Sequence, residues 1–362
     1  MKAVRKFLSD QEGVALVFVA LMLVVIMGMS ALVIDYGSLT TSKRHLVATA
    51  DAAALAGVQE LAEVPIKGEV TQSVYDTALA VAISNAKNKA AEYVALNYPG
   101  VTTDVNDMTV VYSTTEKSLT VPLVKEDISL TFAKFLGHNY GKVSAASKAA
   151  IEYVDDFETD GSGSLLPFFL TEDTYEVLDA DEAFTIKGKD ADTVTINGVT
   201  MPGNFGFAAF NPYMESDNFL LQNKYLWYLC AGEEILQSEE TGDLGLSVDS
   251  WIKTTTGNIT AATPYLKYRY DKYQPNAYAM VPIVTNTFYQ KPDGTAMDKF
   301  EGTCYNKIIG YAMIRILDVD TDNEEVEACL DPKEWLTNFK GSTTNIETEW
   351  NRTAKVLVLT DI

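Results

Sequence analysis

The chain has 362 residues, 47% of them hydrophobic, and a formal net charge of −22 at pH 7. This length predicts two or three domains, and the hydrophobic fraction excludes wholesale disorder. Residues 1–150 carry 14 acidic against 13 basic residues, whereas residues 151–362 carry 36 against 15. Because so acidic a second half is repelled by phosphate backbones, the charge argues against nucleic-acid binding and predicts two regions in different surroundings.

The first predicted element is a transmembrane helix at residues 14–34. This run, VALVFVALMLVVIMGMSALVI, is 21 residues long and has no charged residue. As a helix it would be about 31 Å long, which matches the ~30 Å hydrocarbon core of a bilayer. A cleaved secretory signal is the main alternative, but the run is longer than a usual signal core and lacks a clean A-x-A site. We interpret the run as a retained anchor in the cell membrane.

Basic residues flank this run on both sides. Three of them, Lys2, Arg5 and Lys6, precede it, and two, Lys43 and Arg44, follow it. The excess before the run predicts that residues 1–13 are a short cytoplasmic tail. The bulk of a single-pass chain is then extracytoplasmic.

A second helical segment, the predicted stalk helix, begins at Asp35 and extends to Ala62. A stripe of mostly small residues recurs along it at helical spacing: Leu46, Ala50, Ala53, Gly57 and Leu61. Ala53 and Gly57 have the small-xxx-small spacing that lets another helix approach closely. Two interpretations stay open: the stripe covers the protein's own core, or it packs beside other such helices in an assembly.

The order of these parts resembles one known family. A short basic tail, EG and an apolar span are followed by DYG, a polar turn and ATADAAALAG. This order and spacing resemble the N-terminal signature of the Tad (tight adherence) pilus-assembly proteins, the TadE/TadG-like group. The resemblance implies a membrane-anchored accessory protein of a Flp-type pilus without enzymatic activity. Its partners would be the membrane and other Tad/Flp pilus assembly proteins, with a homo- or hetero-oligomer formed through the stalk helix.

The resemblance also raises the question of processing. Prepilin peptidases in general cut after a glycine that precedes the apolar segment, and the Gly13–Val14 bond has that position. Phe18 stands at the fifth position of the chain so formed, where glutamate is usual. A cleaved subunit that begins at Val14 and a permanent anchor that begins at Met1 both stay open.

The rest of residues 35–154 is expected to be a small α+β domain on the stalk helix. The predicted elements are a helix at 73–97, strands at 108–113 and 117–125, a short helix at 126–137 and a closing strand at 142–154. Pro122 lies within the second strand, and we therefore expect an edge or a bulge there.

Residues 155–164, DDFETDGSGS, are predicted to be a linker, since they are acidic, contain Gly and Ser and have almost no apolar residues. Residues 165–362 are expected to form an acidic, β-rich extracytoplasmic domain. Its strand-like runs are LLPFFLT, AFTIKG, TVTING, YAMVPIVTNTFY, KIIGYAMIRIL and KVLVLT, and its helix-like stretches are residues 218–231 and 258–273. The predicted fold class is therefore α+β, with a transmembrane helix that continues into a stalk helix, a small α+β domain and a β-rich α+β C-terminal domain.

Two acidic motifs have the residue types that bind hard cations. Residues 160–164 fit D-x-S-x-S, the adhesion pattern of von Willebrand A domains, which would suit Mg²⁺, but no strand–helix series follows and we favour a linker. The second motif, D-x-D-x-D beginning at Asp318, resembles the start of an EF-hand loop. Asn323 stands in place of the turn glycine, and Cys329 stands in place of the bidentate glutamate. Its weak candidate ligands for Ca²⁺ are Asp318, Asp320, Asp322 and Glu324. A solvated acidic turn is the favoured interpretation.

The sequence contains no recognisable catalytic constellation. Its two histidines, His45 and His138, lie in no Ser/His/Asp, Cys/His or HExxH setting. Three cysteines, Cys230, Cys304 and Cys329, leave open one disulfide with a free thiol or three buried thiols. We therefore predict no catalytic residues, no cofactor and no enzyme. A structural assembly protein is the leading hypothesis, and a surface-anchored adhesin or binding module, with or without a metal, is the alternative.

Overall fold

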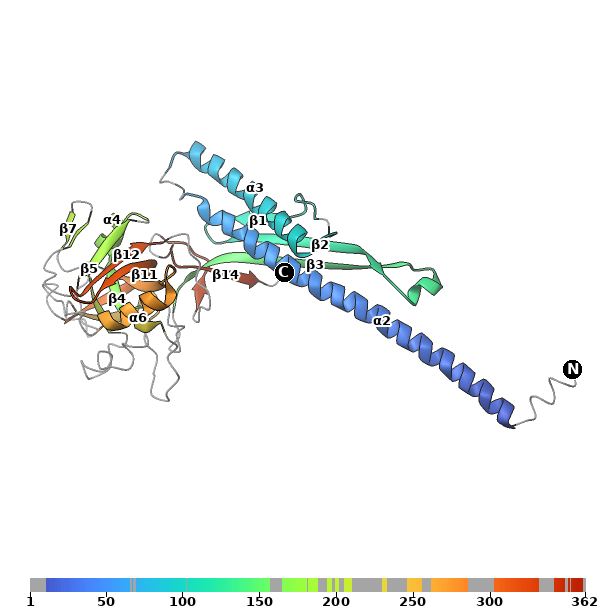
Figure 1. Ribbon diagram of the computed structural model, residues 1–362. Coiled ribbons are helices and arrows are strands. Elements are labelled where there is room, and N and C mark those ends of the chain that lie inside the picture. Colours follow the sequence, from blue (N-terminus) through green and yellow to red (C-terminus); the bar gives the residue numbers. More distant parts are fainter. Residues whose placement is uncertain are drawn as a thin grey trace, which may run out of the picture. The chain divides into compact units, whose positions relative to one another are not determined.

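The computed structural model describes most of the N-terminal part of the chain and a set of segments in the C-terminal part (Figure 1). The described residues are 11–65, 67, 70–101, 103–156, 165–180, 182–187, 194–196, 199–201, 205–209, 230–232, 246–255, 262–285, 303–331, 342–348, 351 and 353–360. The chain divides into two compact units. The first comprises residues 1–113, 117–150 and 358–362, and the second comprises residues 114–116 and 151–357.

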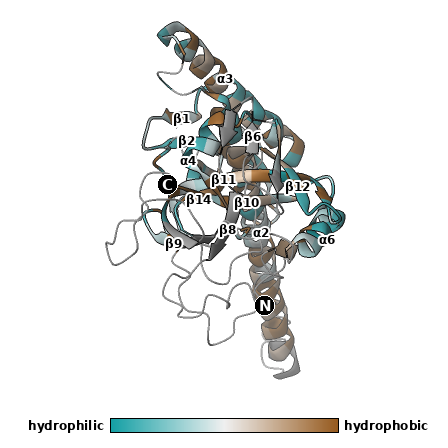
Figure 2. Ribbon diagram, turned by 90° about the vertical axis from the view of Figure 1, so that its left-hand side faces the viewer, coloured by the Kyte–Doolittle hydropathy of each residue, from teal (hydrophilic) through white to brown (hydrophobic). Residues whose placement is uncertain are grey.

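One long helix, α2 (Gln11–Val58), dominates the first unit and is followed by the 3₁₀ turn η1 (Gln59–Glu63). The run predicted to span a membrane and the predicted stalk up to Val58 are thus one continuous helix of 48 residues. The N-terminal part of α2 is long and apolar enough to cross a membrane, and its large side chains are uncovered. Figure 2 shows this part in hydrophobic colours. An uncovered, all-round apolar helix is typical of a segment whose surroundings are lipid.

The C-terminal part of α2 packs against α3 (Gln72–Asn97) and the sheet of the first unit. The face of α3 that is buried consists of residues four positions apart: Ala82, Ala86, Ala90 and Val94. These small side chains let the two helix axes approach closely. Gly57 of α2 has no room for a side chain, because an added Cβ would lie 2.6 Å from the Ala86 carbonyl oxygen of α3 and 2.4 Å from Leu119 Cδ2 of β2.

Three neighbouring antiparallel strands of a five-stranded sheet pack with these helices: β1 (Thr109–Tyr112), β2 (Lys117–Ser129) and β3 (Tyr140–Val154). Strand β2 lies against α2. The β1–β2 register ends at Thr120, so Pro122 lies beyond the paired part of β1, as expected for a proline at an edge position.

The prediction of a short helix at residues 126–137 is wrong for most of these residues. β2 continues through Ser129, with a bulge between Lys125 and Ile128, and only Ala133–Leu136 form a 3₁₀ turn, η2. The strand persists because Ile128 and Leu130, two residues apart, are both buried and β3 supplies the backbone partners. Gly137, with φ of 91°, does end the turn as expected of a glycine at that position.

The second unit contains a seven-stranded, mostly antiparallel sheet with the order β10-β4-β8-β9-β11-β12-β5, in which β10 also pairs with β11. Among its described residues, the helices with defined ends are α4 (Glu172–Val177) and α6 (Thr263–Tyr273). Its strands are β4 (Phe168–Thr171), β5 (Ala183–Lys187), β8 (Phe205–Ala209), β9 (Trp251–Thr255), β10 (Tyr278–Val284), β11 (Thr303–Asp320) and β12 (Glu325–Leu330). A separate ribbon pairs β6 (Val194–Ile196) with β7 (Val199–Met201). Two further strands, β13 (Thr343–Thr344) and β14 (Lys355–Thr360), pair with β3.

The core of the second unit lies where α6 packs on the sheet. Leu266 of α6 is fully buried there, and Tyr265 and Tyr270 pack against the same cluster. The strand-like runs of the sequence coincide with β4, β5, β6, β10, β11 and β14. Of the helix predicted at 218–231 only residues 230 and 231 are described, and the helix predicted at 258–273 begins at Thr263. The α+β fold class, with a long apolar N-terminal helix and two main sheets, is confirmed.

Two glycines of α2 provide a matched test of the packing. We expect Gly57→Ala to destabilise the full-length protein by about 1–3 kcal/mol, because its Cβ has no room beside α3 and β2. Gly37→Ala on the same helix has nothing within 4 Å of the new Cβ, so it should be neutral or stabilise by about 0.5–1 kcal/mol. Thermal unfolding in detergent measures both. Equal stability of the two variants would contradict the packing.

Candidate functional site

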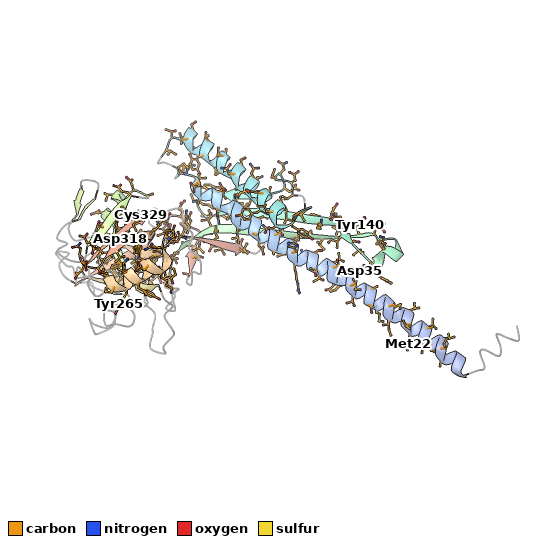
Figure 3. The ribbon with its side chains drawn as sticks, in the orientation of Figure 1. Met22, Asp35, Tyr140, Tyr265, Asp318 and Cys329 are labelled. Atoms are coloured by element: carbon orange, nitrogen blue, oxygen red, sulfur yellow. The ribbon has the colours of Figure 1, made fainter. Side chains whose placement is uncertain are left out.

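The site that stands out in the first unit is the contact between Asp35 of α2 and the hairpin tip, the segment of residues 130–139 that joins β2 to β3. Asp35 is the first residue after the uncharged run and is only 8% exposed. Its carboxylate accepts three backbone hydrogen bonds: Oδ1 from the N–H of Thr131 at 2.5 Å, and Oδ2 from those of Phe132 and Ala133, each at 2.8 Å. Figure 3 labels Asp35 on α2 and Tyr140 at the start of β3.

The hydrogen bonds decide the charge state of Asp35. Burial by itself would raise the pKa of this carboxyl, but the hydrogen bonds from Ala133, Thr131 and Phe132 outweigh burial and lower it. The three donors lie at the start of the η2 turn, where backbone N–H groups lack partners within the turn. An ionised carboxylate from another helix therefore satisfies them, as a capping side chain would.

Further contacts join the hairpin to α2 on both sides of Asp35. They occur in order along the helix: the Phe132 ring against Gly28, the three amides on Asp35, Gly141 against Leu39, and the Lys43 ammonium donating to the Ser144 carbonyl. The hairpin thus follows α2 over about 22 Å, at 1.5 Å per residue from Gly28 to Lys43. These contacts join the end of the apolar run to the folded unit.

The predicted packing stripe lies farther along the same helix. Its members Leu46, Ala50, Ala53 and Gly57 of α2 and Leu61 of η1 are all buried. α2 packs there on α3 and β2 of its own unit. In this structure the stripe therefore covers the protein's own core, and an association between copies would need another face of α2.

The two histidines lie at separate places. The His45 ring stacks on Tyr98, with the ring centroids 4.2 Å apart, and its Nε2 lies 3.2 Å from the Asn97 carbonyl oxygen. These contacts attach the end of α3 to α2. His138 is exposed in the hairpin tip.

The weak metal candidates lie at the turn between β11 and β12. Asp320 Oδ1 accepts hydrogen bonds from the N–H groups of Asp322 and Asn323 at 2.8 and 3.0 Å, and Oδ2 accepts one from the Asn323 side chain at 2.7 Å. The backbone hydrogen bond from Asn323, then its side chain, then the Asp322 N–H lower the pKa of Asp320. Asp318 lies two residues earlier on β11, and Glu324 closes the turn with φ of 56°.

Within the described ranges, no group of three or more His, Cys, Asp or Glu residues is placed to hold a metal ion. The D-x-S-x-S motif at 160–164 lies outside the described residues. Cys230 and Cys329 are buried free thiols, and burial raises the pKa of Cys230. The Cys304 side chain also lies outside the described part of the chain.

Sequence reasoning did not find the role of Asp35, although it singled out the DYG that contains this residue. A lone acid directly after an uncharged run of 21 residues was the available signal, because such an acid near lipid needs partners. The partners themselves lie 96–98 residues away in a segment predicted to be helical.

Comparison with known proteins finds one matching family. Residues 13–60 match the family model described as "Putative Flp pilus-assembly TadE/G-like". The matched range covers nearly all of α2 and the start of η1, and it contains Asp35 and most of the packing stripe. No curated protein and no solved structure matches the chain. The N-terminal resemblance to the Tad family is therefore confirmed for this segment.

Replacing Asp35 tests the contact with the hairpin tip. In Asp35→Asn, we expect the amides of Thr131, Phe132 and Ala133 to exchange with solvent faster, because a neutral amide side chain cannot accept all three bonds equally well. Hydrogen–deuterium exchange of the full-length protein in nanodiscs measures this. Asp51→Asn removes the same charge elsewhere on α2 and is the control. Unchanged exchange at residues 131–133 would contradict the assignment.

The same variant has a definite pH dependence. The folded pKa of Asp35 is lowered, so its stabilising contribution is complete above the unfolded value of 3.8 and is lost as the pH falls through the folded pKa. We expect the melting temperatures of wild type and Asp35→Asn to differ by a constant amount near neutral pH and to converge below pH 3.8. If the difference between the two melting temperatures grew as the pH fell, the folded pKa of Asp35 would be raised instead of lowered.

A calcium titration tests the β11–β12 turn. We expect millimolar Ca²⁺ to leave the melting temperature unchanged, since both Asp320 oxygens already accept hydrogen bonds within the turn. Asp320→Ala should lower the melting temperature equally with and without Ca²⁺. A rise with Ca²⁺ that Asp320→Ala abolishes would establish a metal site instead.

Proposed function

We propose that this chain is a membrane-anchored, non-enzymatic accessory protein for the assembly or presentation of a Flp-type (Tad) pilus. The family match at residues 13–60 implies a role in Tad/Flp pilus assembly, and the apolar part of α2 is consistent with an anchor. One observation carries the proposal: the matched range is the single helix that joins an uncovered apolar part to a packed stalk.

The anchor is the first step of the proposal. Residues 14–34 would span the membrane once, with residues 1–13 cytoplasmic and the remainder extracytoplasmic. The contacts of α2 support a retained anchor over a cleaved signal, because Gly28 and Asp35 are both held by the hairpin tip. Removal of the whole apolar run would expose the Phe132 ring that Gly28 covers.

The stalk is the second step. In the first unit, α3 and β2 cover one face of α2 beyond Leu46, and the hairpin covers it from Gly28 to Lys43. A helix supported over this length is stiff, so a displacement at the membrane is transmitted to the folded unit. Because the packing stripe is occupied within the unit, we place association with other Tad/Flp proteins on the uncovered apolar part of α2, inside the membrane.

The acidic C-terminal region is the third step. Residues 151–362 hold 36 of the acidic residues against 15 basic ones. Such a surface stays soluble and is repelled by anionic lipid headgroups. We propose that it projects from the anchor and organises or presents the pilus.

Gene replacement in the native host tests the proposed function. We expect deletion of the gene to abolish surface pili, Asp35→Asn to reduce their number, and Asp51→Asn, which removes the same charge elsewhere on α2, to retain them. Electron microscopy counts the pili, and carbonate extraction checks that each variant remains in the membrane. Normal piliation after deletion would contradict the proposal. Loss of adherence with intact pili, together with glycan binding by the full-length protein, would support an adhesin instead.

A further inference from the structure

The hairpin tip reaches below the end of the apolar run. Two ring carbons of Phe132 lie 3.9 and 4.0 Å from the position that a Cβ on Gly28 would take. Gly28 lies six residues before Ile34, which is about 9 Å along the helix at 1.5 Å per residue. Between residues 15 and 34 every residue of α2 is exposed except Gly28 and Ala31, which are half-buried. The tip therefore covers a small patch within a segment that is otherwise uncovered.

We propose that the hairpin tip, residues 130–139, inserts into the extracytoplasmic surface of the bilayer and that lipid headgroups and upper acyl chains are its partner. The inference rests on the proposed anchor. If residues 14–34 fill the hydrocarbon core, a ring beside Gly28 lies about 9 Å below the level of Ile34. That depth is typical of interfacial segments, whose apolar faces are buried about 5–10 Å into the boundary between headgroups and acyl chains.

The backbone of the tip is suited to apolar surroundings. In lipid, an N–H group without an acceptor costs several kcal/mol, so irregular segments are tolerated only where they are satisfied internally. Thr131, Phe132 and Ala133 donate to Asp35, and Leu130 donates to the Asn139 carbonyl at 3.1 Å. The N–H groups at the other end also have acceptors: Gly137 donates to Lys134 and His138 to Ala133. Asp35 thus holds the tip against α2 and also supplies the hydrogen-bond acceptors that three of its backbone N–H groups need.

The side chains of this region follow the order expected across an interface. In the tip, Phe132 is half-buried against Gly28, and Lys134 is exposed and can reach lipid phosphates. Above them, Tyr36 and Tyr140 are 70% and 65% exposed. Gly141, the neighbour of Tyr140, contacts Leu39, about 7 Å above Ile34 along the helix. Exposed tyrosines at that level match the aromatic belt of membrane proteins.

Tryptophan fluorescence in vesicles tests the insertion. The native tryptophans are all in the second unit: Trp227, Trp251, Trp335 and Trp350. Full-length Phe132→Trp, reconstituted in phosphatidylcholine brominated on the upper acyl chains, should lose more than half of the emission that it adds to wild type. Tyr140→Trp should lose less. Val81→Trp, at an exposed apolar position on α3, should lose none and is the matched control.

Each outcome of this experiment is decisive. Leu136→Trp, in the same η2 turn, is a second probe in case the first variant fails to fold. Quenching of the added emission by aqueous iodide but not by brominated lipid would overturn the insertion. Protection from both quenchers would overturn it too, because a protein partner would then cover the tip. Vesicle flotation separates the two claims: protein that floats without lipid quenching keeps the anchor, whereas protein that does not float refutes the anchor and the insertion together.

Discussion

The carboxylate of Asp35 is the constraint on which the first unit depends. A carboxylate at the end of an uncharged apolar run is costly unless it has hydrogen-bond partners, and three amides of the hairpin tip supply them. The same bonds fix the height of the tip on α2, so Phe132 meets Gly28 and Gly141 meets Leu39. Beyond the tip, β3 contacts α2 again where Lys43 donates to the Ser144 carbonyl. Farther along the helix, α2 packs on β2 and α3.

The two parts of the chain differ strongly in charge, which suggests that they have different surroundings. The N-terminal part is nearly neutral and its most apolar segment is uncovered, as is typical of a helix surrounded by lipid, whereas the C-terminal part is strongly acidic. The family match covers only the helix, which is the element that such proteins would need in common to be held in a membrane. In our proposal the anchor and its support belong to Tad pilus assembly, and the acidic unit is what this chain presents outside the membrane.

Local pattern was sufficient for part of this fold. The apolar run and the alternating strands at 108–113, 117–125 and 142–154 each carry their own periodicity, so they were predictable. Residues 126–137 were not, because acids followed by a glycine also start and end a helix, and the pairing of β2 with β3 is set outside the segment. The site was not predictable either, since the partners of Asp35 are 96–98 residues away. The small-residue stripe predicts close packing but does not say which helix packs on it, and here it is α3.

The most direct test of the Asp35 contact is to titrate its carboxyl group. The ¹³C carboxyl resonance of Asp35, followed by NMR in the full-length protein in nanodiscs, reports its pKa without reference to unfolding. The three amide hydrogen bonds predict a midpoint below the ordinary value of 3.8. A midpoint at or above 3.8 would mean that burial dominates, that the amides of the hairpin tip do not bind the carboxylate, and that the tip is not held at this height on α2.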